Sequence, residues 1–252
     1  MKKTAVLLLF WIAAALSAQN VIPSHGVLRF QSGPYSLILS APSAFTPTVF
    51  RFEDTDLLAK SGANGTILSF PGGKMLGASA ATEKVEKLHL TVDGREQEIR
   101  TNGQYAGKRI VLEKESVIGG YRFYSSYILT PDGLELPIRY RCENDQKPSY
   151  FYLFAMGFSP QFSDYLTPAG KSLFQADGGW GPNSDFPWTA LYMKSAGTGV
   201  VLSFPRKIPL VSRKSTFWDH KVYKKFYLFH AVPEFKPGKE SPVYQMNIRA
   251  FK

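Results

Sequence analysis

The chain has 252 residues, 14% of them aromatic, and it contains one cysteine and carries a formal net charge of +10. This length suits one large β domain or two small ones and provides enough core to fold without cross-links. A single cysteine excludes an internal disulfide, and no His–Cys spacing indicates a metal site, so we expect neither a metal nor a cofactor. The basic residues are scattered, are densest from Arg206 to Lys225 and fit no nucleic-acid motif. The charge therefore favours general solubility, with a polyanion site as the alternative.

The N-terminus has the features of a secretory signal peptide. Two lysines precede an apolar run from Ala5 to Leu16, and Ala15 and Ala18 supply the small residues of a cleavage site. The run is too short for a membrane-spanning helix. The sequence therefore predicts a signal peptide over residues 1–18, a mature chain beginning at Gln19, no membrane span, and a secreted or periplasmic location.

The mature chain alternates apolar and polar residues with the two-residue period of β-strands, and almost nothing in it has a helical period. Turns rich in glycine, proline, asparagine and aspartate separate the strands. The pattern predicts that residues 19–252 form a single all-β domain, a large antiparallel β-sandwich. The predicted strands cover residues 27–31, 35–40, 48–53, 66–70, 85–92, 96–101, 109–114, 121–129, 134–143, 149–158, 188–194, 199–205, 225–232 and 242–251.

The clearest hairpin lies in the middle of the chain. From Leu134 to Cys142 every second residue is apolar, and the turn Thr130–Gly133 separates this strand from the preceding one. Cys142 falls on the apolar face, which predicts a buried and unreactive thiol. Arg139 and Arg141 fall on the polar face, where they could bind a carboxylate or sulfate, or simply form cross-strand ion pairs.

Three stretches, residues 129–140, 144–154 and 235–244, resemble the galactose mutarotase-like supersandwich. Aldose 1-epimerases and many domains of polysaccharide-processing enzymes have this fold. The epimerases of this family carry a histidine just after the second stretch, within an Asn-His-x-Tyr-Phe pattern. The corresponding run here, residues 152–158, contains no histidine. The resemblance therefore implies the fold and a carbohydrate ligand, and it places no acid/base group where the epimerases have one.

Residues 177–188 form the strongest candidate for a ligand site. The segment combines Trp180 and Trp188 with Asp177 and Asp185, and its glycines and prolines predict an irregular loop. Aromatic faces stack on sugar C–H groups while carboxylates bind hydroxyls, so this combination is typical of sugar sites. We expect the two tryptophans to form one wall of the site, the alternative being that they plug the end of the sandwich.

Further candidates come from the last third of the chain. Trp218 could stack on a sugar, and Asp219 and His220 could act on hydroxyls; we place them in a long loop after Pro209, with an ordinary surface loop as the alternative. His230 alternates with apolar residues, so it is either a core histidine or a base facing a concave sheet.

The leading prediction for function is a secreted carbohydrate-interacting protein that binds a glycan or helps to process one, with an anionic polysaccharide as one possible partner. The second prediction is an enzyme of the same fold, an epimerase or a lyase acting on an acidic polysaccharide. The third is a structural or protein-binding envelope protein. The sequence does not identify an oligomeric state.

Overall fold

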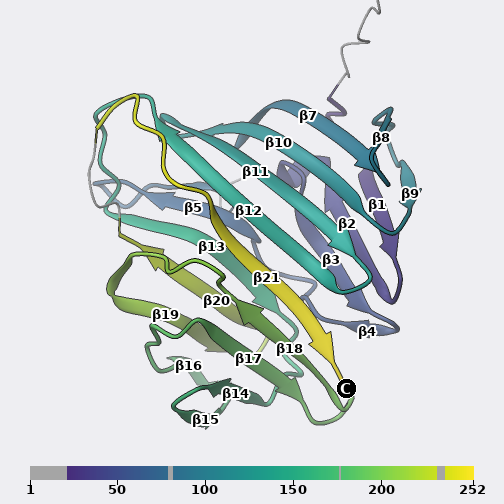
Figure 1. The fold of residues 1–252 in the computed structure, drawn as a ribbon. Helices are drawn as coiled ribbons and strands as arrows, with labels where there is room; N and C mark the ends of the chain where they lie inside the picture. The colour runs from purple at the N-terminus through teal and green to yellow at the C-terminus, as the bar shows by residue number, and fades with distance from the viewer. Residues whose placement is uncertain (1–21, 79–81, 176, 232–235) are drawn as a thin grey trace, which may run out of the picture.

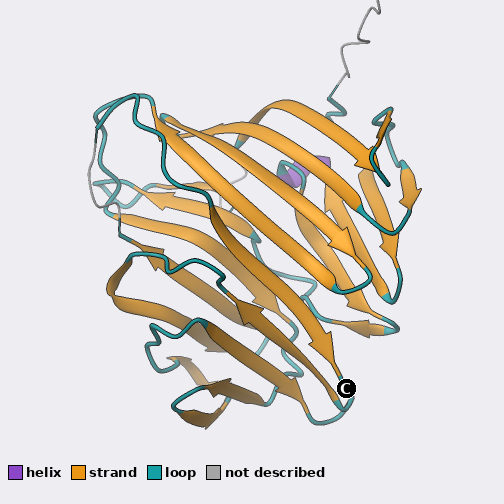
Figure 2. Cartoon of the chain, viewed as in Figure 1, coloured by secondary structure: helices purple, strands orange, loops and turns teal. Residues whose placement is uncertain are grey.

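The computed structural model describes residues 22–78, 82–175, 177–231 and 236–252 (Figure 1). Most of this part of the chain is β-strand, and the helical structure in it is the short 3-10 helix η1, Ala41–Ser43 (Figure 2). None of its helical structure is long and apolar enough to cross a membrane. The predicted signal peptide lies outside the described residues, and the assignment of a single domain stays a prediction.

The strands form three sheets. In spatial order, the five-stranded sheet consists of β4 (Thr55–Asp56), β3 (Thr46–Phe52), β2 (Tyr35–Ser40), β1 (Val27–Ser32) and β9 (Gln104–Ala106). In the same order across the sheet, the ten-stranded sheet consists of β15 (Gly170–Leu173), β14 (Asp164–Thr167), β17 (Trp188–Met193), β18 (Thr198–Ser203), β21 (Tyr244–Phe251), β12 (Gly133–Cys142), β11 (Tyr121–Thr130), β10 (Ile110–Ile118), β7 (Lys84–Val92) and β8 (Arg95–Gln97). The six-stranded sheet consists of β16 (Asp177–Trp180), β19 (Leu210–His220), β20 (Tyr223–His230), β13 (Tyr150–Phe158), β5 (Gly65–Ser69) and β6 (Met75–Gly77).

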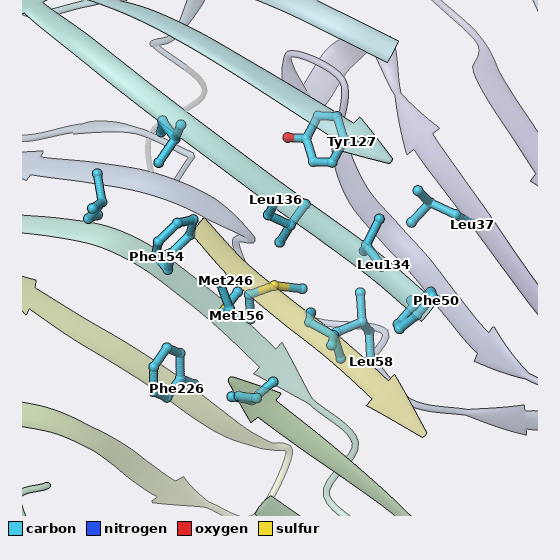
Figure 3. Close-up of a cluster of buried hydrophobic side chains, with 14 of the residues drawn as sticks. Leu37, Phe50, Leu58, Tyr127, Leu134, Leu136, Phe154, Met156, Phe226 and Met246 are labelled. Atoms are coloured by element: carbon cyan, nitrogen blue, oxygen red, sulfur yellow. The ribbon is translucent and has the colours of Figure 1, made fainter. Parts of the chain in front are cut away.

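The three sheets share one apolar core. Leu134 and Leu136 of β12 belong to the same buried cluster as Leu37 of the five-stranded sheet and Phe154 and Phe226 of the six-stranded sheet (Figure 3). Within the large sheets the neighbouring strands run antiparallel, and each sends alternate side chains into this core. The predicted antiparallel β-sandwich is therefore confirmed.

The central hairpin forms as the alternation predicts. β11 and β12 pair from Tyr121↔Cys142 to Thr130↔Gly133, so the turn lies at the predicted position. Cys142 is buried, and its thiol lies 2.6 Å from the carbonyl oxygen of Asn144.

The predicted loop after Pro209 is wrong, because residues 210–220 form strand β19. Leu210 pairs with His230, and the next paired position is Ser215 with Leu228. Between these two pairs β19 advances five residues while β20 advances two, so β19 contains a bulge. This bulge, which includes Ser212 and Arg213 with positive φ, breaks the two-residue period from which a strand is recognised.

Candidate functional site

The outer face of the six-stranded sheet carries a group of aromatic side chains that point away from the shared core. We call this group the aromatic face. It extends from β13 across β20 and β19 to the edge strand β16, and its members are Tyr150, Tyr152, Trp180, Trp218, Tyr227 and Phe229.

Strand register places these rings together. Tyr152 of β13 lies opposite Phe229 of β20, and Trp218 of β19 lies opposite Trp180 of β16. Directly opposite residues of antiparallel strands point to the same face, so their side chains meet. The ring centroids of Tyr152 and Phe229 are 4.6 Å apart, and those of Trp180 and Trp218 are 4.9 Å apart. Tyr227 joins the two pairs, since its ring centroid lies 5.4 Å from that of Trp180 and 5.2 Å from that of Tyr152.

The aromatic face has a buried floor and an open rim. Tyr152 and Phe229 are buried, whereas Tyr150 and Trp180 expose 52% and 54% of their surface. A contiguous group of exposed aromatic rings, unlike a single exposed apolar residue, marks a candidate interaction surface. Flat rings of this kind can stack against the apolar face of a sugar ring, at the geometry in which aromatic contacts are favourable.

Two lysines complete this surface. The Nζ of Lys214 lies 5.4 Å from the ring centroid of Phe229, and the Nζ of Lys225 lies 5.4 Å from that of Tyr227. The bulge in β19 includes Lys214 and carries it to the aromatic face. Lys225 is buried, and desolvation lowers its pKa to about 8.

The structure separates the two tryptophans that we expected on one wall. Trp180 lies in the six-stranded sheet, at the end of β16, whereas Trp188 begins β17 of the ten-stranded sheet. Asp185 lies between them, with its carboxylate 3.5 Å from Lys207 Nζ. Asp177 begins β16, and its backbone pairs with that of His220. Trp180 is therefore on the aromatic face, and Trp188 and Asp185 are not.

The other candidates from the last third of the chain also lie in different places. Trp218 is on the aromatic face. Asp219, its neighbour in sequence, points to the opposite side of β19, where it is buried and forms an ion pair with Lys224. His220 ends the strand and packs against Tyr223 with 5.1 Å between ring centroids.

His230 is a core histidine. Its Nε2 lies 2.8 Å from the hydroxyl of Tyr140, and its Nδ1 lies 3.1 Å from the carbonyl oxygen of Pro209. A carbonyl only accepts, so Nδ1 carries the proton and Nε2 accepts from the tyrosine hydroxyl. Burial lowers the pKa of His230 to about 4, so the ring is neutral at neutral pH.

Arg139 and Arg141 lie on the outer face of the ten-stranded sheet. Arg139 forms an ion pair with Glu240 and lies 4.3 Å from the ring centroid of Tyr124. Arg141 is 2.8 Å from the carboxylate of Glu143. Both guanidinium groups thus have carboxylate partners within the chain, and their role in ligand binding stays a prediction.

Four aromatic residues of this surface were not expected from the sequence: Tyr150, Tyr152, Tyr227 and Phe229. Lys214 and Lys225 belong to the basic stretch from Arg206 to Lys225, for which a polyanion site was the alternative interpretation. In the sequence these aromatics look like ordinary core residues of two apolar strands. A signal was nevertheless present, because residues 150–158 are apolar on both faces of the strand, and one shared core can bury only one of them. No group of three or more metal-ligating side chains occurs within the described part of the chain.

No protein-family model and no curated protein matches the sequence. Among solved structures, an Escherichia coli K12 protein provisionally assigned as an aldose 1-epimerase has a TM-score of 0.51 and 14% identity, with 89% of this chain and 98% of that chain covered. A galactose mutarotase-like protein from Lactobacillus casei ATCC 334 has a TM-score of 0.52 and 9% identity, with 90% and 100% covered. The GH36 α-galactosidase of Geobacillus stearothermophilus has a TM-score of 0.52 and 10% identity, with 89% of this chain and 40% of that chain covered. This chain therefore has the galactose mutarotase-like fold, which occurs in proteins that bind or process carbohydrates.

Proposed function

We propose that the protein binds a carbohydrate on the aromatic face and does so outside the cytoplasm. The observation that carries the proposal is the half-exposed ring of Trp180, held at the rim by the rings of Trp218, Tyr227 and Phe229. Such a preformed surface can stack on a sugar without first ordering its side chains. The apolar N-terminal segment of the sequence supports export, and the fold supports a sugar ligand.

Two of the three candidate catalytic groups lie away from the aromatic face. Acid/base catalysis at a sugar needs a group that touches the ligand and titrates near neutral pH. His230 is enclosed in the core and neutral, and Asp219 is tied to Lys224 on the opposite side of β19 from Trp218. These two candidates cannot reach a sugar that lies on the aromatic face.

The proposal is tested with Trp180→Ala. Loss of one stacking ring removes on the order of 1 kcal/mol beyond the area that it buries, so affinity should fall several-fold or more. Because the ring is half exposed, the melting temperature should change little. Glycan-array binding followed by calorimetry measures the first effect, and thermal melting measures the second.

Phe186→Ala is the matched control. Phe186 is a partly exposed aromatic, with 37% of its surface accessible, that precedes β17 and lies outside the aromatic face. This variant should bind the ligand like the wild type. The proposal is contradicted if Trp180→Ala keeps full affinity, or if a folded wild-type protein binds no glycan.

A further inference from the structure

Three lysines are almost fully buried in the described chain, and they differ in their partners. Lys114, Lys224 and Lys225 expose 4%, 2% and 6% of their surface. An ammonium group removed from water is costly unless a carboxylate or several hydrogen bonds compensate it. Lys114 Nζ lies 2.7 Å from Glu83 and also donates to the carbonyl of Ala44, and Lys224 forms an ion pair with Asp219.

Lys225 lacks such compensation within the described residues. No carboxylate of that part of the chain lies within ion-pair distance, and the contact of its Nζ is with the ring of Tyr227. Burial lowers its pKa, because removal from water disfavours the charged amine. Two of the three buried lysines are therefore neutralised internally, and the third is not.

The unneutralised lysine points toward the aromatic face. In the β19–β20 pair Lys225 lies opposite Trp218, in the β13–β20 pair it lies opposite Gly157, and its Nζ lies over the ring of Tyr227, a member of the aromatic face. Lys225 is thus a cation at the floor of the surface whose rim is formed by Trp180 and Tyr150.

Among the side chains that the structure describes, the charged and titratable groups around Lys225 supply no negative charge at neutral pH. Its own strand contributes Tyr223 and Tyr227, and β13 contributes Tyr152. From β19 come Lys214 and His220. The surface is therefore positive as well as aromatic.

We propose that the bound sugar carries an acidic group, a uronate carboxylate or a sulfate ester, and that this group forms an ion pair with the Nζ of Lys225 while the rings stack on the sugar. This inference rests on the proposed function, since it names the chemical class of the ligand of the same face. The ligand would supply the anion that Glu83 supplies to Lys114 and Asp219 supplies to Lys224.

The pH dependence follows from the protonation of Lys225. In the free protein its pKa is lowered to about 8, and a bound anion raises it because the anion favours the charged amine. Below about pH 8 the amine is already charged, so affinity should be constant there. Above that pH, binding should take up a proton and affinity should fall as the pH rises.

The test compares matched acidic and neutral sugars by calorimetry at neutral pH. The probes are oligogalacturonate, alginate oligosaccharide and sulfated galactan oligosaccharide, each beside its methyl-esterified or desulfated counterpart. For the wild type, at least one acidic sugar should bind on the order of tenfold more tightly than its neutral counterpart, the strength expected of one desolvated charge-assisted contact. The uronate and sulfate arms distinguish the two sources of charge.

Lys225→Met should remove this preference and keep the residual affinity for the neutral counterpart, while Lys221→Met at the exposed β19–β20 turn should bind like the wild type. If the acidic preference survives in Lys225→Met, or if acidic and neutral sugars bind the wild type equally, the inference is wrong and the proposed function stands. If none of these probes binds, the inference is wrong, and the glycan array decides the proposed function separately. NMR of the reductively ¹³C-methylated wild-type lysine gives a second reading that needs no substitution: its pKa should rise on addition of the acidic sugar, and an unchanged pKa overturns the inference.

Discussion

At the scale of single residues, His230 illustrates how burial removes a histidine from chemistry. The hydrogen bonds to Tyr140 and Pro209 satisfy both ring nitrogens of the neutral form, and the rings of Phe151 and Tyr244 pack against it at 5.2 Å and 4.8 Å between centroids. Protonation of Nε2 would place a positive charge among these rings, and burial makes that charge costly. The environment therefore supports one protonation state and one tautomer.

This environment makes the free energy of unfolding depend on pH in the acidic range. The folded-state pKa of about 4 lies below the unfolded value of about 6.5, so the unfolded chain binds more protons between these two values. The free energy of unfolding should therefore fall by about 3 kcal/mol from this residue as the pH drops through that window. His230→Gln should flatten the dependence, and His25→Gln, in the exposed N-terminal arm, should leave it unchanged. Urea denaturation at several pH values measures it, and an equal slope in all three proteins would contradict the assignment.

Lys225 should produce the opposite effect in the alkaline range. Its folded pKa of about 8 lies below the unfolded value of about 10.5, so the burial cost is fully present below pH 8 and is relieved as the pH rises through the window. The free energy of unfolding should rise from about pH 8 toward pH 10 by up to about 3 kcal/mol. Lys225→Met should lack this rise, and it should be more stable than the wild type at neutral pH. Denaturant unfolding near neutral pH and at about pH 9.5 measures both effects. A variant less stable than the wild type at neutral pH would speak against the unpaired lysine.

At the scale of elements, the sequence predicts regular strands well and irregular ones poorly. Strand β12 alternates over its whole length, so its hairpin with β11 follows from the pattern alone. Strand β19 does not, because its bulge shifts the alternation and its inward residue Asp219 is charged. The ion pair of Asp219 with Lys224 and the hydrogen bond that it accepts from the backbone N–H of Gln175 make that inward charge tolerable. Such contacts through space cannot be read from the spacing in the sequence.

The β11–β12 hairpin provides a test of how closely the backbone packs around a single glycine. Gly133 begins β12 with φ of +139°, and a Cβ added there would lie 2.3 Å from the carbonyl oxygen of Ile248 on β21. Gly133→Ala should therefore force β12 and β21 apart and cost about 2–3 kcal/mol or more. Gly170 has nearly the same φ, +138°, with open space around it, so Gly170→Ala isolates the cost of the dihedral alone. Thermal melts that rank the two variants equally would show that the contact with β21 is unimportant.

At the scale of the whole molecule, the two large sheets present outer faces of different character. The ten-stranded face neutralises its own charges: Arg122 contacts the carboxylates of Glu86, Glu115 and Glu143, and His89 contacts Glu113. The six-stranded face presents rings together with two lysines whose amines lie over those rings. Composition and alternation could predict the sandwich, but which outer face lacks internal partners depends on strand pairing across the whole chain. For that reason the sequence pointed to Arg139 and Arg141 as readily as to Trp180 and Trp218.

The difference between the faces yields a prediction that separates the sequence-based candidates. Arg139→Gln breaks a half-exposed ion pair with Glu240, and such pairs contribute less than about 1 kcal/mol to stability. The change lies on a different sheet from the aromatic face, so affinity for the glycan should be unchanged, and the effects of Arg139→Gln and Trp180→Ala should add without coupling. Calorimetry measures the affinities, and thermal melting measures the stabilities, of the two single variants and the double variant. If Arg139→Gln alone weakens binding of an acidic glycan, the ligand lies on the ten-stranded sheet, and the self-neutralised face, not the aromatic one, is the site.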